Sequence, residues 1–509
     1  METKTAAIEM RNITKRFGPV LANDKVWLNI YRGEILALLG ENGSGKTTLM
    51  NMLSGIYFPD EGEIKIDGKE VVIRSPKDAF DNGIGMIHQH FKLVDVLTAA
   101  ENIVLGLPGK LDLKAASAKI REICDKYGFS VDPVQKIYDM SVSQKQTVEI
   151  VKVLYRGADI LILDEPTAVL TPQETDKLFA VLRNMRNDGK AIVIITHKMH
   201  EVEALSDRVA ILRHGQFIGD MLTAHTNAQE MTNMMVGHAV SLNIERPDPV
   251  DPKPRIEVKG LTVRSVDGIV KLDDVSFTAN SGEILGIAGI SGCGQKELLE
   301  AIAGLQTVES GSISYIEDDG SREELIGKDP LSIAELGVSL SFVPEDRLGM
   351  GLVGNMNLAD NMMLRSFRRG KSIFTDRRSP RALAESVVQE LSVSTPSVDT
   401  PVRRLSGGNV QKVLVGREIA SAPTVLLTAY AVRGLDIHSS YTIYDLINRQ
   451  KKAGVAVIFV GEDLDVLLEL CDRILVLCGG KVSGIVSGRG AEKREVGMMM
   501  TKLGGQSHE

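Results

Sequence analysis

The sequence predicts an α/β protein built from two similar halves, each with a mainly parallel β-sheet and crossover helices. Short β-branched runs such as 160–163 and 191–195 alternate with amphipathic segments of helix length, which is the pattern of βαβ units. Similar stretches recur in the second half of the chain, which indicates duplication of a whole domain. A proline-rich segment separates the two copies.

The repeat sets the expected domain boundaries. Residues 32–36 (RGEIL) return as residues 281–285 (SGEIL), and other matches lie near the two ends of each copy. A repeat that occurs only twice and has this length is typical of a duplicated domain, whereas a solenoid repeats short units many times. We therefore expect one domain over residues 1–240 and a second over residues 256–509.

Residues 241–255 are expected to form the linker, because proline is concentrated there. Proline fixes φ and lacks a backbone N–H, so such a segment favours an extended conformation and is not expected to join a helix or a central strand. We predict an extended tether. Its prolines are Pro247, Pro249, Pro252 and Pro254.

Composition excludes several classes of protein. The chain has 509 residues, of which 43% are hydrophobic and 25% charged, as in ordinary globular proteins with more than one core. A formal net charge of −8 provides no basic surface, so we expect no nucleic-acid partner. The apolar runs are strand-sized and the N-terminus has no apolar signal core, which favours the cytoplasm. Four cysteines without CxxC spacing indicate neither a disulfide framework nor a zinc site.

A phosphate-binding loop is predicted near the start of the first copy. Eight residues fit GxxxxGK[ST] and lie between an apolar strand (35–39) and a helical segment (49–53). Thr48, which follows the eight residues, is a further candidate for nucleotide binding. In this context backbone N–H groups close around phosphates, Lys46 reaches the outer phosphates, and the Thr47 hydroxyl is available to Mg²⁺. The eight residues are Gly40, Glu41, Asn42, Gly43, Ser44, Gly45, Lys46 and Thr47.

Two carboxylates follow a later buried strand. The run 160–163 ends in Asp164 and Glu165, where Asp164 can hold the hydration shell of Mg²⁺ and Glu165 can orient or deprotonate a water molecule. An apolar strand ending in acids is weak evidence alone, but it becomes specific downstream of a phosphate loop. The sequence from Thr171 to Glu174 carries a capping pattern, so a helix should begin at Pro172.

Two further polar residues are candidates for the same site. His197 follows the strand 191–195, from which an imidazole could contact a terminal phosphate. The alternative is a structural histidine at a strand end. Gln89, within a short histidine-containing stretch, is equally compatible with an ordinary polar loop.

Together these residues resemble the ATP-binding cassette of ABC transporters, and the resemblance covers nearly the whole chain twice. It implies ATP and Mg²⁺ as cofactors. It also implies two tandem P-loop NTPase domains, each with a core sheet, an antiparallel β subdomain and a helical subdomain. The resemblance assigns Gln89 to Mg²⁺ and water, Glu165 to the catalytic base and His197 to the switch histidine. Phe17 resembles the aromatic residue that stacks on adenine, with core packing as the alternative.

The second copy lacks the catalytic set. Its phosphate loop has Gln295 in the place of Lys46 and Lys296 in the place of Thr47. Gln295 lacks the positive charge of Lys46, and Lys296 lacks the hydroxyl with which Thr47 can bind Mg²⁺. At the remaining positions, Asp164, Glu165, His197 and Gln89 align with Ala429, Tyr430, Glu462 and Glu345 respectively.

The two copies complement each other at a second motif. Residues 405–409 (LSGGN) are close to the LSGGQ signature of the family, whereas the first copy has MSVSQ at residues 140–144. In the family, two cassettes close head to tail with each ATP between one phosphate loop and the opposite signature. The resemblance therefore implies intramolecular pairing, with one hydrolytic site completed by Ser406, Gly407 and Gly408, and one degenerate site.

Tandem cassettes with a degenerate second half resemble the ATPase subunits of bacterial importers for monosaccharides and nucleosides. Residues 83–103 and 343–362 are most similar to the nucleoside branch. This resemblance implies two integral-membrane permease subunits and an extracytoplasmic solute-binding lipoprotein as partners. It places the chain peripherally on the cytoplasmic face of the inner membrane.

Three alternatives remain open at this point. The first is an importer of a monosaccharide of the ribose or galactose type. The second is a soluble ABC protein acting on ribosomes or DNA, which usually keeps both sites competent and carries a charged linker and basic patches that this sequence lacks. The third, a pair of cassettes that binds ATP without splitting it, conflicts with the intact residues of the first copy.

Overall fold

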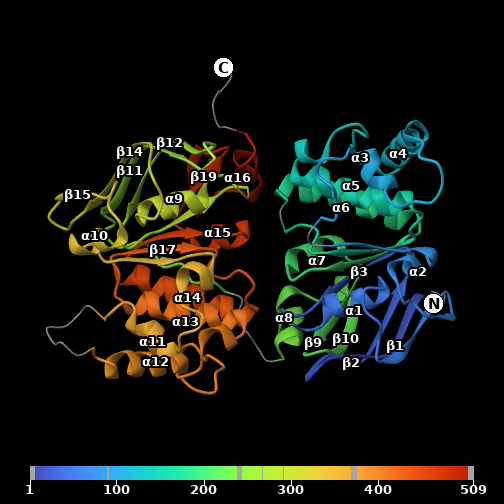
Figure 1. Cartoon of the computed structure of the whole chain (residues 1–509), viewed down its shortest axis with the longest axis horizontal. Coiled ribbons are helices and arrows are strands. Elements are labelled where there is room, and N and C mark those ends of the chain that lie inside the picture. Colours follow the sequence, from blue (N-terminus) through green and yellow to red (C-terminus); the bar gives the residue numbers. More distant parts are fainter. Residues whose placement is uncertain are drawn as a thin grey trace. The chain divides into compact units, whose positions relative to one another are not determined.

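The computed structural model describes residues 6–88, 91–168, 170–237, 243–265, 267–290, 292–367 and 375–502. The chain forms two compact units, Met1–Ser241 and Leu242–Glu509 (Figure 1). Each unit is described by itself. No helix within the described ranges combines the length and the apolar character needed to cross a bilayer.

A six-stranded sheet forms the centre of the first unit. Its strand order is β10-β9-β3-β8-β7-β6, parallel except for the edge pair β9 and β10. Every residue of β3, β8 and β7, three of the four inner strands, is buried, which explains their mainly apolar sequences. The bounds are β3 Glu34–Leu39, β6 Ile84–Ile87, β7 Ile160–Asp164, β8 Ala191–Ile195, β9 Arg208–Arg213 and β10 Gln216–Leu222.

An antiparallel sheet and a group of helices complete the first unit, as predicted. The sheet has the order β2-β1-β4-β5, with β1 Ala6–Phe17, β2 Val20–Tyr31, β4 Glu61–Ile66 and β5 Lys69–Val71. Figure 1 shows α3, α4 and α5 gathered on one side of β3, with β1 and β2 on the other. The helices are α1 Lys46–Leu53, α2 Pro76–Asp81, α3 Ala99–Val104, α4 Leu113–Tyr127, α5 Val142–Tyr155, α6 Pro172–Asn187, α7 Met199–Leu205 and α8 Ala228–Val236.

The second unit repeats this architecture. Its core sheet has the order β16-β17-β18-β13-β19-β20 and its antiparallel sheet the order β12-β11-β14-β15. The strands are β11 Pro254–Arg264, β12 Val270–Asn280, β13 Ile284–Ala288, β14 Ser310–Ile316, β15 Arg322–Glu324, β16 Leu340–Val343, β17 Val425–Ala429, β18 Ala456–Val460, β19 Arg473–Cys478 and β20 Lys481–Ser487. The helices are α9 Gln295–Ile302, α10 Pro330–Glu335, α11 Leu358–Met363, α12 Arg378–Glu390, α13 Gly407–Ala420, α14 Ile437–Lys452, α15 Leu464–Leu470 and α16 Lys493–Met499.

The helix predicted after the Asp164–Glu165 strand end is confirmed. It begins at Pro172, and Thr171 caps it: the Thr171 hydroxyl accepts a hydrogen bond from the Glu174 backbone N–H at 3.4 Å. In return the Thr171 N–H donates to the Glu174 carboxylate at 2.9 Å. This reciprocal capping satisfies two donors that the first helical turn leaves unpaired.

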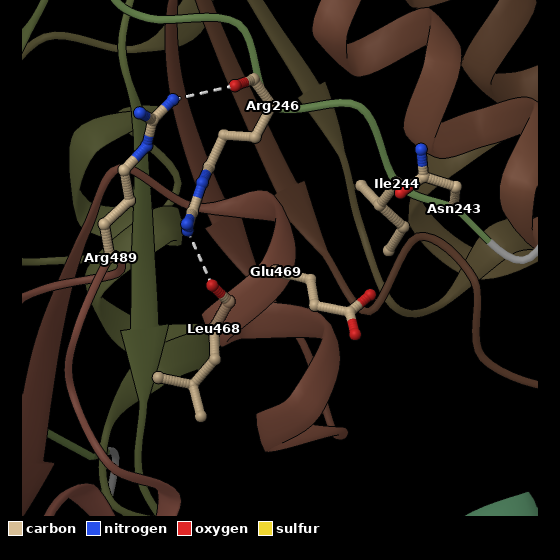
Figure 2. Close-up of a pocket in the computed structure, with 6 residues that line it drawn as sticks. All are labelled: Asn243, Ile244, Arg246, Leu468, Glu469 and Arg489. Atoms are coloured by element: carbon tan, nitrogen blue, oxygen red, sulfur yellow. Dashed lines mark hydrogen bonds between the residues drawn. The ribbon is translucent and has the colours of Figure 1, made fainter.

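The proline-rich segment, which is predicted as an extended tether, makes contacts within the second unit through its described residues. The Arg246 guanidinium donates to the carbonyls of Leu468 (2.6 Å) and Cys471 (2.8 Å) at the end of α15. Arg246 lines a hollow of about 410 Å³ together with Leu468 and Glu469 of α15. These residues are drawn in Figure 2. Lys451, which is buried, donates to the Pro247 carbonyl. The segment is therefore docked along part of its length.

Pro254 corrects a second expectation about this segment. It is the first residue of β11, an inner strand of the antiparallel sheet, where it pairs with Asn280. Proline is compatible with the first residue of a strand, because the ladder does not yet require its missing N–H. The expectation that proline is excluded from a strand interior is therefore correct, but it does not extend to the first residue of a strand.

Candidate active site

The phosphate loop of the first unit connects β3 to α1, as predicted. Gly45 precedes α1 with a left-handed φ of 94°, and a Cβ there would lie 2.3 Å from the Ala22 carbonyl oxygen. Only glycine fits this position. Asn42 and Gly43 form the exposed tip of the loop, and a Cβ on Gly43 would meet nothing within 4 Å. The loop therefore leaves open space at its tip while its base is packed against the chain.

Lys46 is folded into this loop. Its side chain is largely buried, at 7% exposure, and its ammonium donates to the carbonyls of Gly40 at 2.7 Å and Glu41 at 2.9 Å. Burial lowers the pKa of Lys46, and the nearby carboxylates of Glu165 and Asp164 oppose that shift. An anionic phosphate would be a stronger partner for this ammonium than neutral carbonyls.

Thr47 and Asp164 bring the start of α1 to the end of β7. The Thr47 hydroxyl donates to an oxygen of the Asp164 carboxylate at 3.2 Å. Burial raises the pKa of Asp164, while the hydrogen bond from Thr47 lowers it. In nucleotide sites Mg²⁺ takes one or two protein oxygens and completes its octahedron with phosphate oxygens and water. A hydroxyl and a carboxylate in contact beside the phosphate loop fit that ligand set.

Glu165 and His197 form the other half of the cluster. They follow β7 and β8, which are adjacent parallel strands, so their ends meet at the same edge of the sheet. The His197 Nδ1 lies 3.0 Å from a Glu165 carboxylate oxygen, and this hydrogen bond is the main cause that lowers the pKa of Glu165. The lowered pKa keeps the carboxylate ionised and able to accept a proton from water.

The Glu165–His197 contact predicts the acid limb of the pH profile. Catalysis requires the ionised form of Glu165, whose pKa is lowered. ATP turnover should therefore reach its full value above that pKa and should be lost as the pH falls through it. A His197→Ala variant loses the hydrogen bond, so its pKa for Glu165 rises and the acid limb of kcat/KM for ATP moves to higher pH. A His200→Ala variant, which changes an exposed histidine on α7, should leave the limb in place. An unmoved limb in His197→Ala would contradict this assignment.

Phe17 lies at the end of β1 and is 41% exposed, so it is not packed in the core. Its ring contacts Tyr57 edge to face, with ring centroids 5.1 Å apart, and Lys15 lies 5.5 Å from the Phe17 centroid. An exposed aromatic face suits a stacking role. Tyr57 was not considered from the sequence, because it is far from Phe17 along the chain. Gln89 lies outside the described residues.

The end of the phosphate loop in the second unit keeps the left-handed glycine before the helix, with Gly294 at φ 97°, but not the chemistry of the residues that follow it. Gln295 occupies the position of Lys46 at the start of α9, is 3% exposed, and donates its amide to the Ile290 carbonyl at 3.2 Å. Lys296, in the place of Thr47, points away and is 52% exposed, with its ammonium 3.7 Å from Glu300. A neutral amide therefore replaces the buried cation.

The backbone of the lost catalytic position is preserved. Glu165 has φ 47° and Tyr430 has φ 53°, both in the left-handed region that non-glycine residues rarely adopt. The Glu165 N–H donates to the Ile195 carbonyl, and the Tyr430 N–H donates to the Val460 carbonyl, each at 2.9 Å. Burial raises the pKa of Tyr430 to about 12, so its hydroxyl stays neutral and is not a base at ordinary pH.

In the second unit, an arginine connects the residues that align with Gln89 and His197 of the first unit. Arg433 forms ion pairs with Glu345, which aligns with Gln89, and with Glu462, which aligns with His197; the second contact is 2.9 Å. The same guanidinium lies 5.9 Å from the centroid of the Tyr430 ring. Three positions that are predicted to carry hydrolytic residues in the first copy are thus linked to one another in the second.

The two signature segments also differ in structure. Ser406 caps α13, and the Arg347 guanidinium donates to the Gly407 carbonyl at 3.1 Å. In the first unit, Ser141 caps α5 in a reciprocal capping box with Gln144. Val142, whose side chain is exposed, occupies the position that aligns with the first signature glycine. The second unit therefore presents glycine backbone at a helix N-terminus, and the first presents an isopropyl group.

The structure brings most of the predicted residues together. Asp164, Glu165 and His197 meet Lys46 and Thr47 at one edge of the first sheet through the contacts above. Ser44 is buried inside the loop, and Thr48 lies in the first turn of α1. The predicted signature residues Ser406, Gly407 and Gly408 belong to the second unit.

Known proteins resemble both units. The family model described as ABC transporter matches residues 23–168 and 272–428. The chain is 42% identical to the nucleoside import ATP-binding protein NupA of Lactococcus lactis over 99% of each chain. It is 39% identical to the glucose import ATP-binding protein TsgD13 of Haloferax volcanii, over 98% of this chain and 96% of the relative. It is 40% identical to the guanosine import ATP-binding protein NupO of Bacillus subtilis, over 97% of each.

The family match covers both phosphate loops and the strand end that carries Asp164 and Glu165. The chain is similar over nearly its whole length to three proteins that are each named an import ATP-binding protein. The chain belongs to the ABC transporter family and is an ATPase of that family.

Proposed function

We propose that this chain hydrolyses ATP at one site per molecule and thereby drives the import of nucleosides through partner permease subunits. The observation that carries the proposal is the inverse distribution of the two halves of an ABC site. The first unit has Lys46, Thr47, Asp164, Glu165 and His197 in one cluster, and the second has the glycine-containing signature. We take residues 1–240 as the hydrolytic domain, residues 256–509 as its partner and residues 241–255 as their connection.

The hydrolytic centre is proposed to use ATP with Mg²⁺. Lys46 would hold the terminal phosphates, Thr47 and Asp164 would bind the metal ion, and the glycine backbone of the loop would contact phosphate oxygens. Gln89 is proposed to contribute to metal and water binding, and Phe17 to stack on adenine. Bound Mg²⁺ supplies charge neutralisation on the phosphates, while Glu165 accepts the proton of the attacking water and His197 holds Glu165 in place.

The second half of the site is proposed to come from the signature. The Ser406 hydroxyl and the backbone amides near Gly407 and Gly408 lie at the N-terminus of α13, where the helix dipole favours an anion. Head-to-tail pairing of the two domains would place this helix terminus opposite Lys46. The other composite site would combine Gln295 with Val142, so it would have neither the cation nor the glycine backbone.

The nucleoside assignment rests on sequence similarity. Two of the relatives described above are named for nucleoside or guanosine import, and one for glucose import. The solute is recognised by other subunits, so the ATPase carries this information only by descent. A monosaccharide importer is the second candidate, and the relative named for glucose import favours it. Two permease subunits, an extracytoplasmic solute-binding lipoprotein and the cytoplasmic face of the membrane complete the proposal.

Uptake in cells tests the assignment. Deleting the gene for this chain in its host should abolish the uptake of radiolabelled nucleosides and leave the uptake of radiolabelled ribose unchanged. The wild-type gene should restore uptake, and a Glu165→Gln gene should not. Loss of ribose uptake alone would replace the nucleoside assignment with the monosaccharide assignment. Unchanged uptake of both solutes would overturn a role in their import.

A further inference from the structure

A buried carboxylate lies behind the Glu165–His197 pair. Glu201, in the first turn of α7, is 4% exposed. One of its carboxylate oxygens accepts a hydrogen bond from the Thr167 hydroxyl and forms an ion pair with the Lys198 ammonium at 3.2 Å. The other oxygen accepts from the Thr196 hydroxyl at 3.1 Å. Both threonines are buried as well.

The two threonines belong to the two segments that carry the catalytic pair. Thr196 directly precedes His197, and Thr167 follows Glu165 by two residues. Glu201 therefore ties the segment after β7 and the segment after β8 to one point. The separation of these segments determines the 3.0 Å contact between His197 Nδ1 and Glu165.

The second copy shows what the fold does without this carboxylate. With Tyr430 aligned on Glu165 and Glu462 on His197, the residues at the positions of Thr167, Thr196 and Glu201 are Val432, Gly461 and Val466. Val432 and Val466 pack against the hydrophobic core of that unit. The strand ends keep the same pairing, Asp164 with Ile195 and Ala429 with Val460.

This comparison separates stability from positioning. An apolar set of side chains supports the same backbone in the second copy, and replacing a buried polar network by packed apolar groups is often neutral for stability. The polar set occurs in the copy that has Glu165 and His197, and the apolar set occurs in the copy that has lost both. The fold therefore does not require the network, but the catalytic pair coincides with it.

We propose that Glu201 is a positioning residue for hydrolysis, which holds Thr167 and Thr196 so that Glu165 and His197 keep their mutual orientation. This inference rests on the proposed function, because it assigns catalysis to the pair that Glu201 positions. Glu201 itself acts through the two threonines and touches neither the water nor the phosphate.

Replacing the polar set by apolar residues tests the proposal on the full-length chain. The triple variant Thr167→Val/Thr196→Ala/Glu201→Val removes the carboxylate and both threonine hydroxyls together, so none of these three buried groups is left without a partner. Lys198, whose side chain is partly exposed, loses its contacts with Glu201 and Thr196. We expect kcat for ATP to fall about tenfold or more, because small displacements of catalytic groups are costly for rate. The KM for ATP and the melting temperature should stay near the wild-type values. Glu201→Gln, which keeps the size of the side chain, should lower kcat less than the triple variant.

Two controls make the result decisive. Thr232→Val changes a buried threonine of the same unit whose hydroxyl donates to Ala228 of its own helix, and it should leave kcat unchanged. Glu165→Gln is assayed beside the triple variant. Full turnover in the triple variant, together with an inactive Glu165→Gln variant, would overturn the positioning role of Glu201 but not the proposed hydrolytic site. Full turnover in Glu165→Gln would overturn the proposed site. A fall in kcat that tracks a fall in melting temperature would show a merely structural role.

Discussion

Replacing Glu165 with glutamine is expected to reduce ATP turnover by roughly a hundredfold to ten-thousandfold, the range that a general base contributes. The amide has the size of the carboxylate and still meets His197, but it cannot accept the proton of the attacking water. ATP affinity should stay within a few-fold of wild type, since Lys46 and the loop are unchanged. Phosphate release and nucleotide binding by the purified chain, or by its membrane complex, measure the two quantities separately.

Tyr430→Phe is the matched control for this variant. Tyr430 has the same left-handed backbone and the same hydrogen bond to the neighbouring strand, but its hydroxyl is neutral because its pKa is raised to about 12. Losing that hydroxyl should leave turnover within about threefold, as expected for a group without a catalytic role. Comparable losses in both variants would contradict a single hydrolytic site in the first half.

The parts of the fold that follow from local chemistry were predictable from the sequence. The phosphate loop, the strand ends at Asp164 and Glu165, and the capped helix at Pro172 each depend on a short stretch with a strong preference. Duplication helped, because every element had a second example. The loss of the catalytic set in the second copy was also visible, since it needs only an alignment of the chain with itself.

Contacts between distant residues were not predictable in the same way. Nothing in the sequence near Arg433 indicates that it pairs with both Glu345 and Glu462. In the sequence, Glu201 is an acidic residue in the first turn of a helix. The helix dipole favours an acidic residue there, so its presence suggests no further role. Its partner Thr167 comes from another strand end, and only the parallel pairing of β7 and β8 brings them together. A comparison of the two copies for coincident polar-to-apolar changes could have found this set.

The docked linker has the same explanation. Proline content correctly excluded a helix, but the attachment of the segment depends on Arg246 and Lys451 donating to carbonyls. Every residue has a carbonyl acceptor, so the sequence does not indicate which carbonyls Arg246 and Lys451 bind. Proline-rich composition therefore predicted the local conformation and not the packing.

Introducing arginine at Ser406 is expected to inhibit turnover by about a hundredfold, the cost of losing one well-placed donor at a charged oxygen. The long side chain would also occupy the space over Gly407 and Gly408, which the proposed site needs for phosphate. Ser141→Arg makes the same change in the first copy, where Val142 already covers the corresponding position. Turnover in Ser141→Arg should stay within about threefold of wild type, because in the proposed head-to-tail pairing its signature would face a site with Gln295 in place of Lys46.

The two serine variants are well matched in their structural cost. Each serine is exposed and caps a helix of 14 residues, Ser141 through the Gln144 N–H at 3.2 Å and Ser406 through the Asn409 N–H at 3.4 Å. Each substitution therefore loses one cap, worth about 1 kcal/mol of stability. Ser406 also accepts a hydrogen bond from the Asn409 side-chain amide at 2.9 Å, so the melting temperatures of both variants are compared before a difference in ATP hydrolysis is assigned to the signatures. Equal inhibition would mean that both signatures face working phosphate loops, which is incompatible with Gln295 and Tyr430 at the second centre.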